Sequence, residues 1–272
     1  MATIDLNQLN IMGILNVTPD SFSDGGKHNS LDAALYHAES MINDGASIID
    51  VGGESTRPNA PEVALNEELD RVIPVIEKLN ENFDCCISVD TSKAAVMQAA
   101  LQAGAGMIND VRALQEDGAL QVCADSDVPI CLMHMQGQPR TMQKNPKYID
   151  VVEDIKTFFE RRITACETVG IERKRLILDP GFGFGKTLEH NTDLLARLGE
   201  FHSLNLPLLV GISRKSMIGA LLNNAPIEQR LYGSLSAAVI AAMKGATIIR
   251  VHDVKATADA MQIVKAIRNY SV

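Results

Sequence analysis

Residues able to do chemistry stand at the end of nearly every short apolar run in this sequence. They are Asn16, Asp50, Asp90, Asn109, Asp110, His134, Asp179, Ser213, Arg214, Lys215, Arg250, His252 and Asp253. Arginine and lysine bind anions, whereas carboxylates and amides exchange hydrogen bonds with a polar ligand. An Arg and a His from one run, a Lys from the run before it and several carboxylates and amides from other runs together predict one polar site.

Each of these positions also has a simpler interpretation. An Asp or Ser directly after a strand often does no more than cap the next helix. The sequence shows no Ser-His-Asp order and no obvious nucleophile. Covalent catalysis is therefore the weaker hypothesis for such a site.

The apolar runs predict eight β-strands, over residues 11–17, 47–52, 85–90, 107–111, 129–135, 176–180, 206–213 and 247–253. Amphipathic patterns predict helices over 30–46, 65–82, 92–105, 150–170 and 257–269, and an Ala-rich helix over 232–246 either contacts another subunit or packs tightly in the fold. Apolar strands that alternate with helices indicate a parallel sheet, here a closed (β/α)8 TIM barrel, with an open doubly wound sheet as the alternative. The strand ends of a barrel converge on one mouth, which would bring the polar residues together.

The composition fits one large folded unit. The chain has 272 residues, 46% of them hydrophobic, which suits a single barrel domain over residues 1–272. The net charge of −9 argues against a general binder of nucleic acid or anionic membranes, so an anionic substrate must be held by a local cluster of donors. Five cysteines without C-x-x-C spacing predict reduced thiols and a cytoplasmic protein. No apolar run reaches the roughly 18 residues that span a bilayer.

The glycine-rich stretch GFGFGKT, residues 181–187, looks like a phosphate-binding loop but has the wrong spacing. The Walker motif G-x-x-x-x-G-K-[ST] requires a Gly five positions before Gly185, where Pro180 stands. The six histidines are scattered, without the Cys/His spacing of a zinc site. A hard cation held by Asn16, water and a substrate phosphate stays open, because Mg²⁺ is often bound in that way.

Several longer motifs resemble one enzyme family, the dihydropteroate synthases. The motifs are IMGILNVTPDSFSDGG, DVGGESTRP, SVDTSKAAV, INDV, LMHMQG, LDPGFGFGKT, GISRKSMIG and RVHDV, in order and along nearly the whole chain. The resemblance implies a barrel-shaped transferase of the folate pathway. It joins 6-hydroxymethyl-7,8-dihydropterin diphosphate to 4-aminobenzoate, uses Mg²⁺ and releases diphosphate. It also implies a sulfonamide target and a homodimer.

The same resemblance assigns residues to the pterin diphosphate. Asp179 is expected to accept hydrogen bonds from the 2-amino group and a ring N–H, with Lys215 donating to a ring oxygen or nitrogen. Arg250 is expected to stack on the ring and to reach the diphosphate, and Mg²⁺ to bridge Asn16 and the phosphate oxygens. The full expected set for this substrate is Asn16, Asp50, Thr56, Asp90, Asn109, Met133, Asp179, Lys215, Arg250 and His252. Those expected to be catalytic are Asn16, Asp90, Lys215, Arg250 and His252.

The resemblance places 4-aminobenzoate nearer the outside of the mouth. The expected contacts are Phe22, Thr56, Arg57, Pro58, Phe184, Ser213 and Lys215. The polar loop 18–26 and the loop around 55–58 are expected to close over the site, because a cationic intermediate would react with water. Asn59 stands where the family commonly has Gly, and Asn tolerates left-handed backbone angles better than most residues.

Two other hypotheses stay open. One is a pterin-binding methyltransferase domain with methyl-folate and a corrinoid partner, although a methyl donor needs no diphosphate-binding residues. The other is a catalytically silent barrel that acts as a binding subunit. A silent barrel would show altered site positions, whereas Asn16, Asp90, Asn109, Asp179, Lys215, Arg250 and His252 are all present.

Overall fold

The strands form one parallel barrel in the computed structural model, which describes residues 4–18, 27–55, 60–137, 142 and 146–268. Within these residues the strands are β1 (Asn10–Asn16), β2 (Ile48–Gly52), β3 (Cys86–Asp90), β4 (Met107–Asp110), β5 (Ile130–Met133), β6 (Leu176–Asp179), β7 (Leu209–Val210) and β8 (Ile248–Val251). Hydrogen bonds join them in the order β6-β5-β4-β3-β2-β1-β8-β7. A bridge between Leu178 and Leu208 joins β6 to the β7 segment and completes the ring.

This arrangement confirms the predicted barrel and rules out the open doubly wound sheet. Each of the eight predicted runs corresponds to a strand. Strand β1 is as long as its run but begins one residue earlier, at Asn10, and the other seven strands are shorter than their runs. The difference is largest at β7, because Pro207 has no N–H to offer the ladder and the chain turns away after Val210. The polar ends of the runs thus lie at or just beyond the strand ends.

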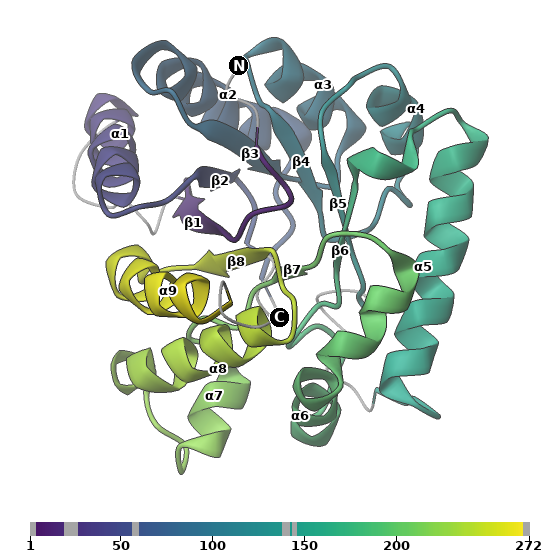
Figure 1. Ribbon diagram of the computed structural model, residues 1–272. Helices are drawn as coiled ribbons and strands as arrows, with labels where there is room; N and C mark the ends of the chain where they lie inside the picture. The colour runs from purple at the N-terminus through teal and green to yellow at the C-terminus, as the bar shows by residue number, and fades with distance from the viewer. Residues whose placement is uncertain (1–3, 19–26, 56–59, 138–141, 143–145, 269–272) are drawn as a thin grey trace.

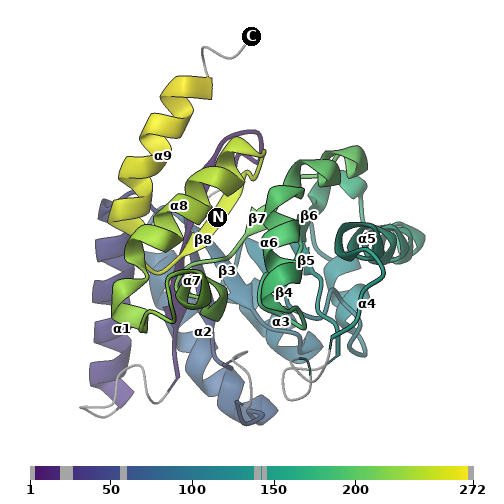
Figure 2. The same cartoon turned by 90° about the horizontal axis from the view of Figure 1, so that it is seen from below.

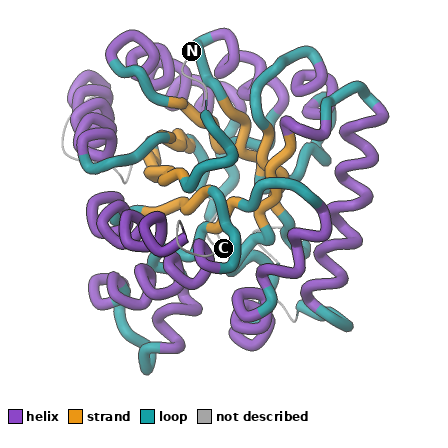
Figure 3. Tube along the Cα trace, viewed as in Figure 1, coloured by secondary structure: helices purple, strands orange, loops and turns teal. Residues whose placement is uncertain are grey.

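Helices surround the strands on the outside (Figures 1 and 3). They are α1 (Lys27–Asn43), α2 (Leu65–Asn82), α3 (Ala94–Gln102), α4 (Ala119–Ala124), α5 (Val151–Thr168), α6 (Leu188–Ala196), α7 (Ser216–Leu221), α8 (Leu231–Met243) and α9 (Val254–Arg268), with short 3₁₀ helices η2 (Arg173–Arg175), η3 (Leu198–Leu204) and η4 (Ile227–Gln229). The six predicted helices are all present, whereas α4, α6 and α7 were not predicted from the sequence. Helix α9 lies beside α8 and against β1, so the last helix meets the first strand (Figure 2).

The hydrophobic core has two parts. A large shell lies between the strands and the helices. A small inner cluster fills the barrel itself and takes one side chain from each strand: Met12, Ile48, Cys86, Met107, Cys131, Ile177, Leu209 and Ile248. None of the helices in the described part of the chain is long and apolar enough to cross a membrane.

Candidate functional site

A largely polar layer lies directly above the inner apolar cluster. Side chains that point the same way recur every second residue along a strand, so the next inward positions are two residues further on. These positions hold Ile14, Asp50, Ser88, Asn109, Met133, Asp179, Gly211 and Arg250. The apolar side chains below keep water out, and the polar layer forms a floor at the C-terminal end of the barrel.

Arg250 connects three strands of this floor. Its Nε donates to Asp50 Oδ2 at 2.6 Å, and its terminal N–H donates to Asp90 Oδ2 at 2.8 Å. Asn109 Nδ2 also donates to Asp50 Oδ2, at 3.1 Å. Burial raises the pKa of Asp90 to about 7, even though Arg250 opposes the shift. The guanidinium therefore fixes two carboxylates whose remaining oxygens can face a ligand.

A second cluster lies across the floor, around Asp179 and Lys215. Gly181 donates its N–H to Asp179 Oδ1 at 2.8 Å, and Lys215 Nζ donates to the Phe182 carbonyl at 2.5 Å. The Lys215 ammonium also lies 4.6 Å from the centre of the Phe184 ring. Burial lowers the pKa of Lys215 to about 8 and raises that of Asp179, while each charge favours the ionised form of the other.

The outermost inward positions form the rim. Ser213 and His252 lie together, with 3.1 Å between Oγ and Nδ1, and Ser213 Oγ also accepts from the His252 N–H. On the opposite strands, a side chain on Gly52 would come within 4 Å of both Asn16 Oδ1 and Asp90 Oδ2. Glycine at position 52 leaves open the space that these two oxygens face.

The structure thus brings together Asn16, Asp50, Asp90, Asn109, Met133, Asp179, Phe184, Ser213, Lys215, Arg250 and His252. They come from separate strands and from the segments directly after β6, β7 and β8. Phe22, Thr56, Arg57 and Pro58 lie outside the described residues, as do Asn59 and most of the predicted loop 18–26.

Several polar strand-end residues do not belong to this site. The buried Asp110 accepts hydrogen bonds from Ser92 Oγ and from the N–H groups of Arg112 and Leu114, so it caps the loop after β4. Arg214 and Asp253 form an ion pair with each other, partly exposed to solvent. These residues follow the simpler interpretation, in which a polar residue after a strand only organises the next turn.

His134 also departs from the common site and leads to a residue that sequence reasoning missed. Its Nδ1 lies 3.0 Å from Lys186 Nζ, and both side chains are buried. Ser88 was missed as well, although it lies in the inward layer. The period of two along β3 is a signal that could have found it, because Ser88 stands midway between Cys86 and Asp90.

The chemistry available to this arrangement is binding and charge stabilisation. One side of the floor holds Arg250 with two carboxylates and an amide, and the other side holds Lys215 with Asp179. Such fixed charges can stabilise charge that develops in a bound substrate. No group of three or more His, Cys, Asp or Glu side chains that could hold a metal ion occurs among residues 4–18, 27–55, 60–137, 142 and 146–268. A metal here would need to take part of its ligands from water or a substrate.

Comparisons with known proteins point to one family. A family model described as "Pterin binding enzyme" matches residues 12–252. The dihydropteroate synthase of Escherichia coli (strain K12) is 61% identical over 264 residues, which are 97% of this chain and 93% of that protein. The solved structure of Yersinia pestis dihydropteroate synthase with a sulfonamide drug complex superposes with a TM-score of 0.93 at 60% identity and covers 98% of this chain and 96% of that one. The Xanthomonas albilineans dihydropteroate synthase with 4-aminobenzoic acid gives a TM-score of 0.92 at 49% identity, covering 99% and 96%.

Proposed function

The chain belongs to the pterin-binding enzyme family, among its dihydropteroate synthases, and from this premise we propose how its residues carry out the reaction. It is a transferase of folate biosynthesis. Its substrates are 6-hydroxymethyl-7,8-dihydropterin diphosphate and 4-aminobenzoate. The methyltransferase and silent-barrel hypotheses find no support in relatives that match nearly the whole chain under the synthase name.

The pterin ring lies on the polar floor. Its edge carries a row of hydrogen-bond donors and acceptors. A buried site must provide a partner for each of them, because every unpaired group lowers the binding free energy by its cost of desolvation. Asp179 accepts from the 2-amino group and the ring N–H, and Lys215 donates to the ring. Asp90 and Asn109 answer the neighbouring ring positions. The observation that carries this proposal is the closeness of the buried Asp179 carboxylate to the half-buried Lys215 ammonium, whose charges favour each other's ionised form, on one side of the floor.

The reaction replaces one bond at the pterin methylene carbon with another. The C–O bond to the diphosphate breaks, the aminobenzoate nitrogen forms the new C–N bond, and the amine proton leaves to solvent. The electron-rich ring stabilises positive charge at the methylene, so bond breaking runs ahead of attack. An aryl amine is unprotonated at neutral pH, and the protein therefore needs no strong base. Its task is to hold both partners in line and to balance the departing negative charge.

Asn16, Arg250 and His252 hold the diphosphate. Asn16 and Asp90 turn oxygens toward the space above Gly52, and hard oxygen donors of this kind suit Mg²⁺. A Mg²⁺ ion bound there through Asn16, water and phosphate oxygens would neutralise charge on the leaving group. Arg250 does the same through its guanidinium, whose planar shape also allows it to stack on the ring.

4-Aminobenzoate lies above the pterin, against Phe184. In the proposal, Ser213 hydrogen-bonds near its carboxylate and Lys215 contacts the same substrate. The support is that the Lys215 ammonium lies 4.6 Å from the centre of the Phe184 ring. Phe22, Thr56, Arg57 and Pro58 complete this part of the site in the proposal, on the strength of the motifs alone. A sulfonamide drug would compete for the same space.

The proposed assembly is a homodimer in the cytoplasm. Helices α7 and α8 lie side by side (Figures 1 and 2). Exposed large apolar side chains occur on these helices, directly after α7 and on η4; they are Leu221, Leu222, Ile227, Tyr232, Ile240 and Met243. Contact with a second copy would bury them, and sedimentation analysis would measure the resulting mass. The five cysteines are free and buried, which supports a reducing compartment.

A reconstituted assay tests the proposed function. Purified protein is incubated with the pterin diphosphate, Mg²⁺ and 4-aminobenzoate, and both dihydropteroate and released diphosphate are measured. We expect the two products in equal amounts and no dihydropteroate when either substrate is omitted. Diphosphate release without dihydropteroate, or no reaction, would contradict the proposal.

A further inference from the structure

The turn between β6 and α6 contains a buried lysine that the proposed chemistry does not use. This turn, residues 181–186, is the glycine-rich stretch that lacks phosphate-loop spacing. Lys186 is only 3% exposed, and lysine is rarely buried to that extent unless its ammonium group is fully paired. The turn that contains Lys186 contacts both Asp179 and Lys215, so Lys186 can influence the site.

Lys186 Nζ hydrogen-bonds two main-chain carbonyls of the turn. It donates to the carbonyls of Gly181 at 2.8 Å and Phe184 at 3.1 Å, and it lies 3.0 Å from His134 Nδ1. Burial lowers the pKa of Lys186 and that of His134. An ammonium would donate to the neutral imidazole and a neutral amine would accept from it, so both carbonyl bonds persist in either state.

One end of the turn leads to Asp179. Gly181 donates its N–H to Asp179 Oδ1 and presents its carbonyl to Lys186. Lys186 and Asp179 therefore hold the two polar groups of the same residue. Gly181 has a φ of +71°, and a Cβ there would lie 1.9 Å from the His134 carbonyl oxygen. Only glycine fits this position, so residue 181 has no side chain that could hold it, and its carbonyl is held by Lys186 instead.

The rest of the turn leads to Lys215. The Phe182 carbonyl accepts from Lys215 Nζ, and the Phe184 ring lies beneath the same ammonium. Lys186 also hydrogen-bonds the Phe184 carbonyl, and it therefore restricts the positions of the Phe182 carbonyl and the Phe184 ring.

Asn191 Oδ1, which accepts from the Gly183 N–H, and the Tyr148 hydroxyl, which donates to the Gly185 carbonyl, hold the middle of the turn from outside. The buried Lys186 amine holds the carbonyls on either side of Phe182, next to both residues on the pterin side of the floor.

We propose that Lys186 is a positioning residue for pterin binding, which acts by holding the 181–186 turn and, through it, Asp179 and Lys215. This inference rests on the proposed function. Lys186 does not touch the substrate. Its contribution is to remove the freedom that the glycine-rich turn would otherwise have, so that the two polar groups are already in place when the ring arrives.

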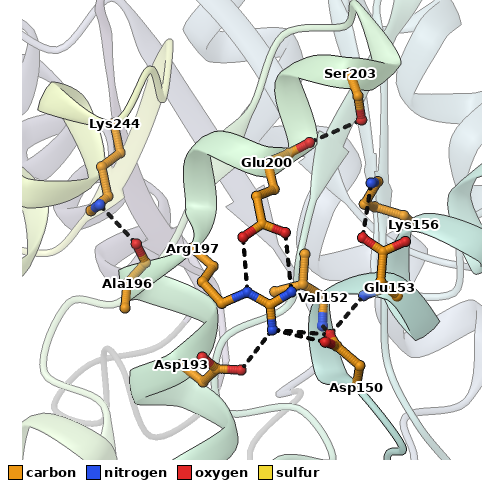
Figure 4. Close-up of polar contacts among 10 residues, drawn as sticks. All are labelled: Asp150, Val152, Glu153, Lys156, Asp193, Ala196, Arg197, Glu200, Ser203 and Lys244. Atoms are coloured by element: carbon orange, nitrogen blue, oxygen red, sulfur yellow. Dashed lines mark hydrogen bonds and ion pairs between the residues drawn. The ribbon is translucent and has the colours of Figure 1, made fainter.

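The test compares Lys186→Met with a matched control, Lys244→Met. Lys244 also donates to a main-chain carbonyl, that of Ala196 at 2.7 Å (Figure 4), but this hydrogen bond is exposed and joins the C-terminal ends of α6 and α8. Calorimetric titration with the pterin diphosphate in the absence of 4-aminobenzoate gives both Kd and the fraction of competent sites. We expect Lys186→Met to raise Kd at least tenfold, Lys186→Gln to raise it less, and Lys244→Met to leave it unchanged.

The two titration parameters separate positioning from a general structural role. A purely structural defect lowers the melting temperature and the fraction of competent sites but leaves Kd of the folded protein alone, and that result would overturn the inference. If Lys186→Met does not fold, Lys186→Gln is judged by the same criterion. A wild-type protein that fails to bind the pterin diphosphate would instead overturn the proposed function and the inference with it.

Discussion

Two arginines in this molecule are each held by several carboxylates, yet they have different roles. Arg197 lies between α6 and η3 and pairs with Asp150, Asp193 and Glu200 (Figure 4). Arg250 lies on β8 and pairs with Asp50 and Asp90 in the barrel mouth. Both clusters link elements that are far apart in the sequence. The difference is in what surrounds them and in which atoms remain unpaired.

The Arg197 cluster faces water and is complete. The arginine side chain is 29% exposed, its guanidinium uses both oxygens of Asp150 and of Glu200, and Asp150 also caps α5 through the N–H groups of Val152 and Glu153. Such a cluster fastens helices and leaves nothing for a ligand. Water screens each of its charges, so no single pair contributes much to stability.

The Arg250 cluster is more deeply buried and is incomplete, since the arginine side chain is 19% exposed and those of Asp50 and Asp90 are 0% and 10% exposed. Asp50 is almost fully buried, and its Oδ1 has no hydrogen-bond partner among the described residues. The same is true of Ser88 Oγ on the next strand. Unpaired polar atoms in a buried floor are costly. The comparison teaches that unmet hydrogen-bonding capacity next to a buried charge, rather than the number of ion pairs, marks the functional cluster.

The largest expected effect comes from removing each arginine in turn. Arg250→Met leaves Asp50 and Asp90 buried without a cation, so we expect a loss of about 3–5 kcal/mol in the free energy of unfolding. We also expect a drop in kcat/KM on the order of a hundredfold or more. Arg197→Met should lower the melting temperature slightly and leave kcat/KM unchanged. Urea unfolding and steady-state kinetics measure both, and equal kinetic losses in the two variants would remove the distinction.

A smaller effect is expected from Asp179→Asn. The substitution keeps the size of the side chain but removes one acceptor and the negative charge beside Lys215, so the affinity for pterin diphosphate should fall about 10- to 100-fold. Titration without 4-aminobenzoate is the measurement. Asp193→Asn, in the exposed cluster, is the control and should bind normally. Unchanged binding by Asp179→Asn would show that the ring edge lies elsewhere.

The sequence allowed much of this to be predicted because the decisive patterns are local. Alternating strands and helices predict the barrel, and the barrel brings the polar strand ends together. The adjacent Asn109 and Asp110 show the limit. Successive strand residues point to opposite faces, so Asn109 enters the floor while Asp110 caps a loop. Which of the two side chains faces the inside of the barrel depends on the register of β4, and the two adjacent polar residues do not reveal that register.

Two other features depend on the folded structure. Lys186 gave no local sign of burial, because its partners are the carbonyls of its own turn and His134, 52 positions away in sequence. Helices α4 and α7 contain six residues each and are too short to show an amphipathic period. Prediction from the sequence was therefore best for long elements and for residues placed by them.

The pH dependence of catalysis should report the buried cluster. Asp90 must be ionised to pair with Arg250 and to accept with both oxygens, and its pKa is raised to about 7. Lys215 must keep its proton to remain a cation, and its pKa is lowered to about 8. We expect kcat/KM for the pterin diphosphate to rise through pH 7 and fall above pH 8. Lys215→Arg should have lower activity but move the fall to higher pH. If the fall stays at the same pH in that variant, it belongs to another group.

The smallest expected effect is a difference between the two clusters in how strongly salt changes the loss of melting temperature. The distance over which exposed charges act falls from about 10 Å at 0.1 M ionic strength to about 3 Å at 1 M, while buried pairs are screened much less. The difference in melting temperature between wild type and Arg197→Met should therefore shrink to nearly zero as NaCl rises. The difference between wild type and Arg250→Met should persist, because Asp50 and Asp90 stay unpaired at largely buried positions, where salt screens charges much less. Thermal unfolding of the three proteins across this salt range measures both differences. A salt-sensitive defect in Arg250→Met would mean that water and ions reach Asp50 and Asp90. The floor could then no longer be treated as the water-excluded site on which the ring contacts depend.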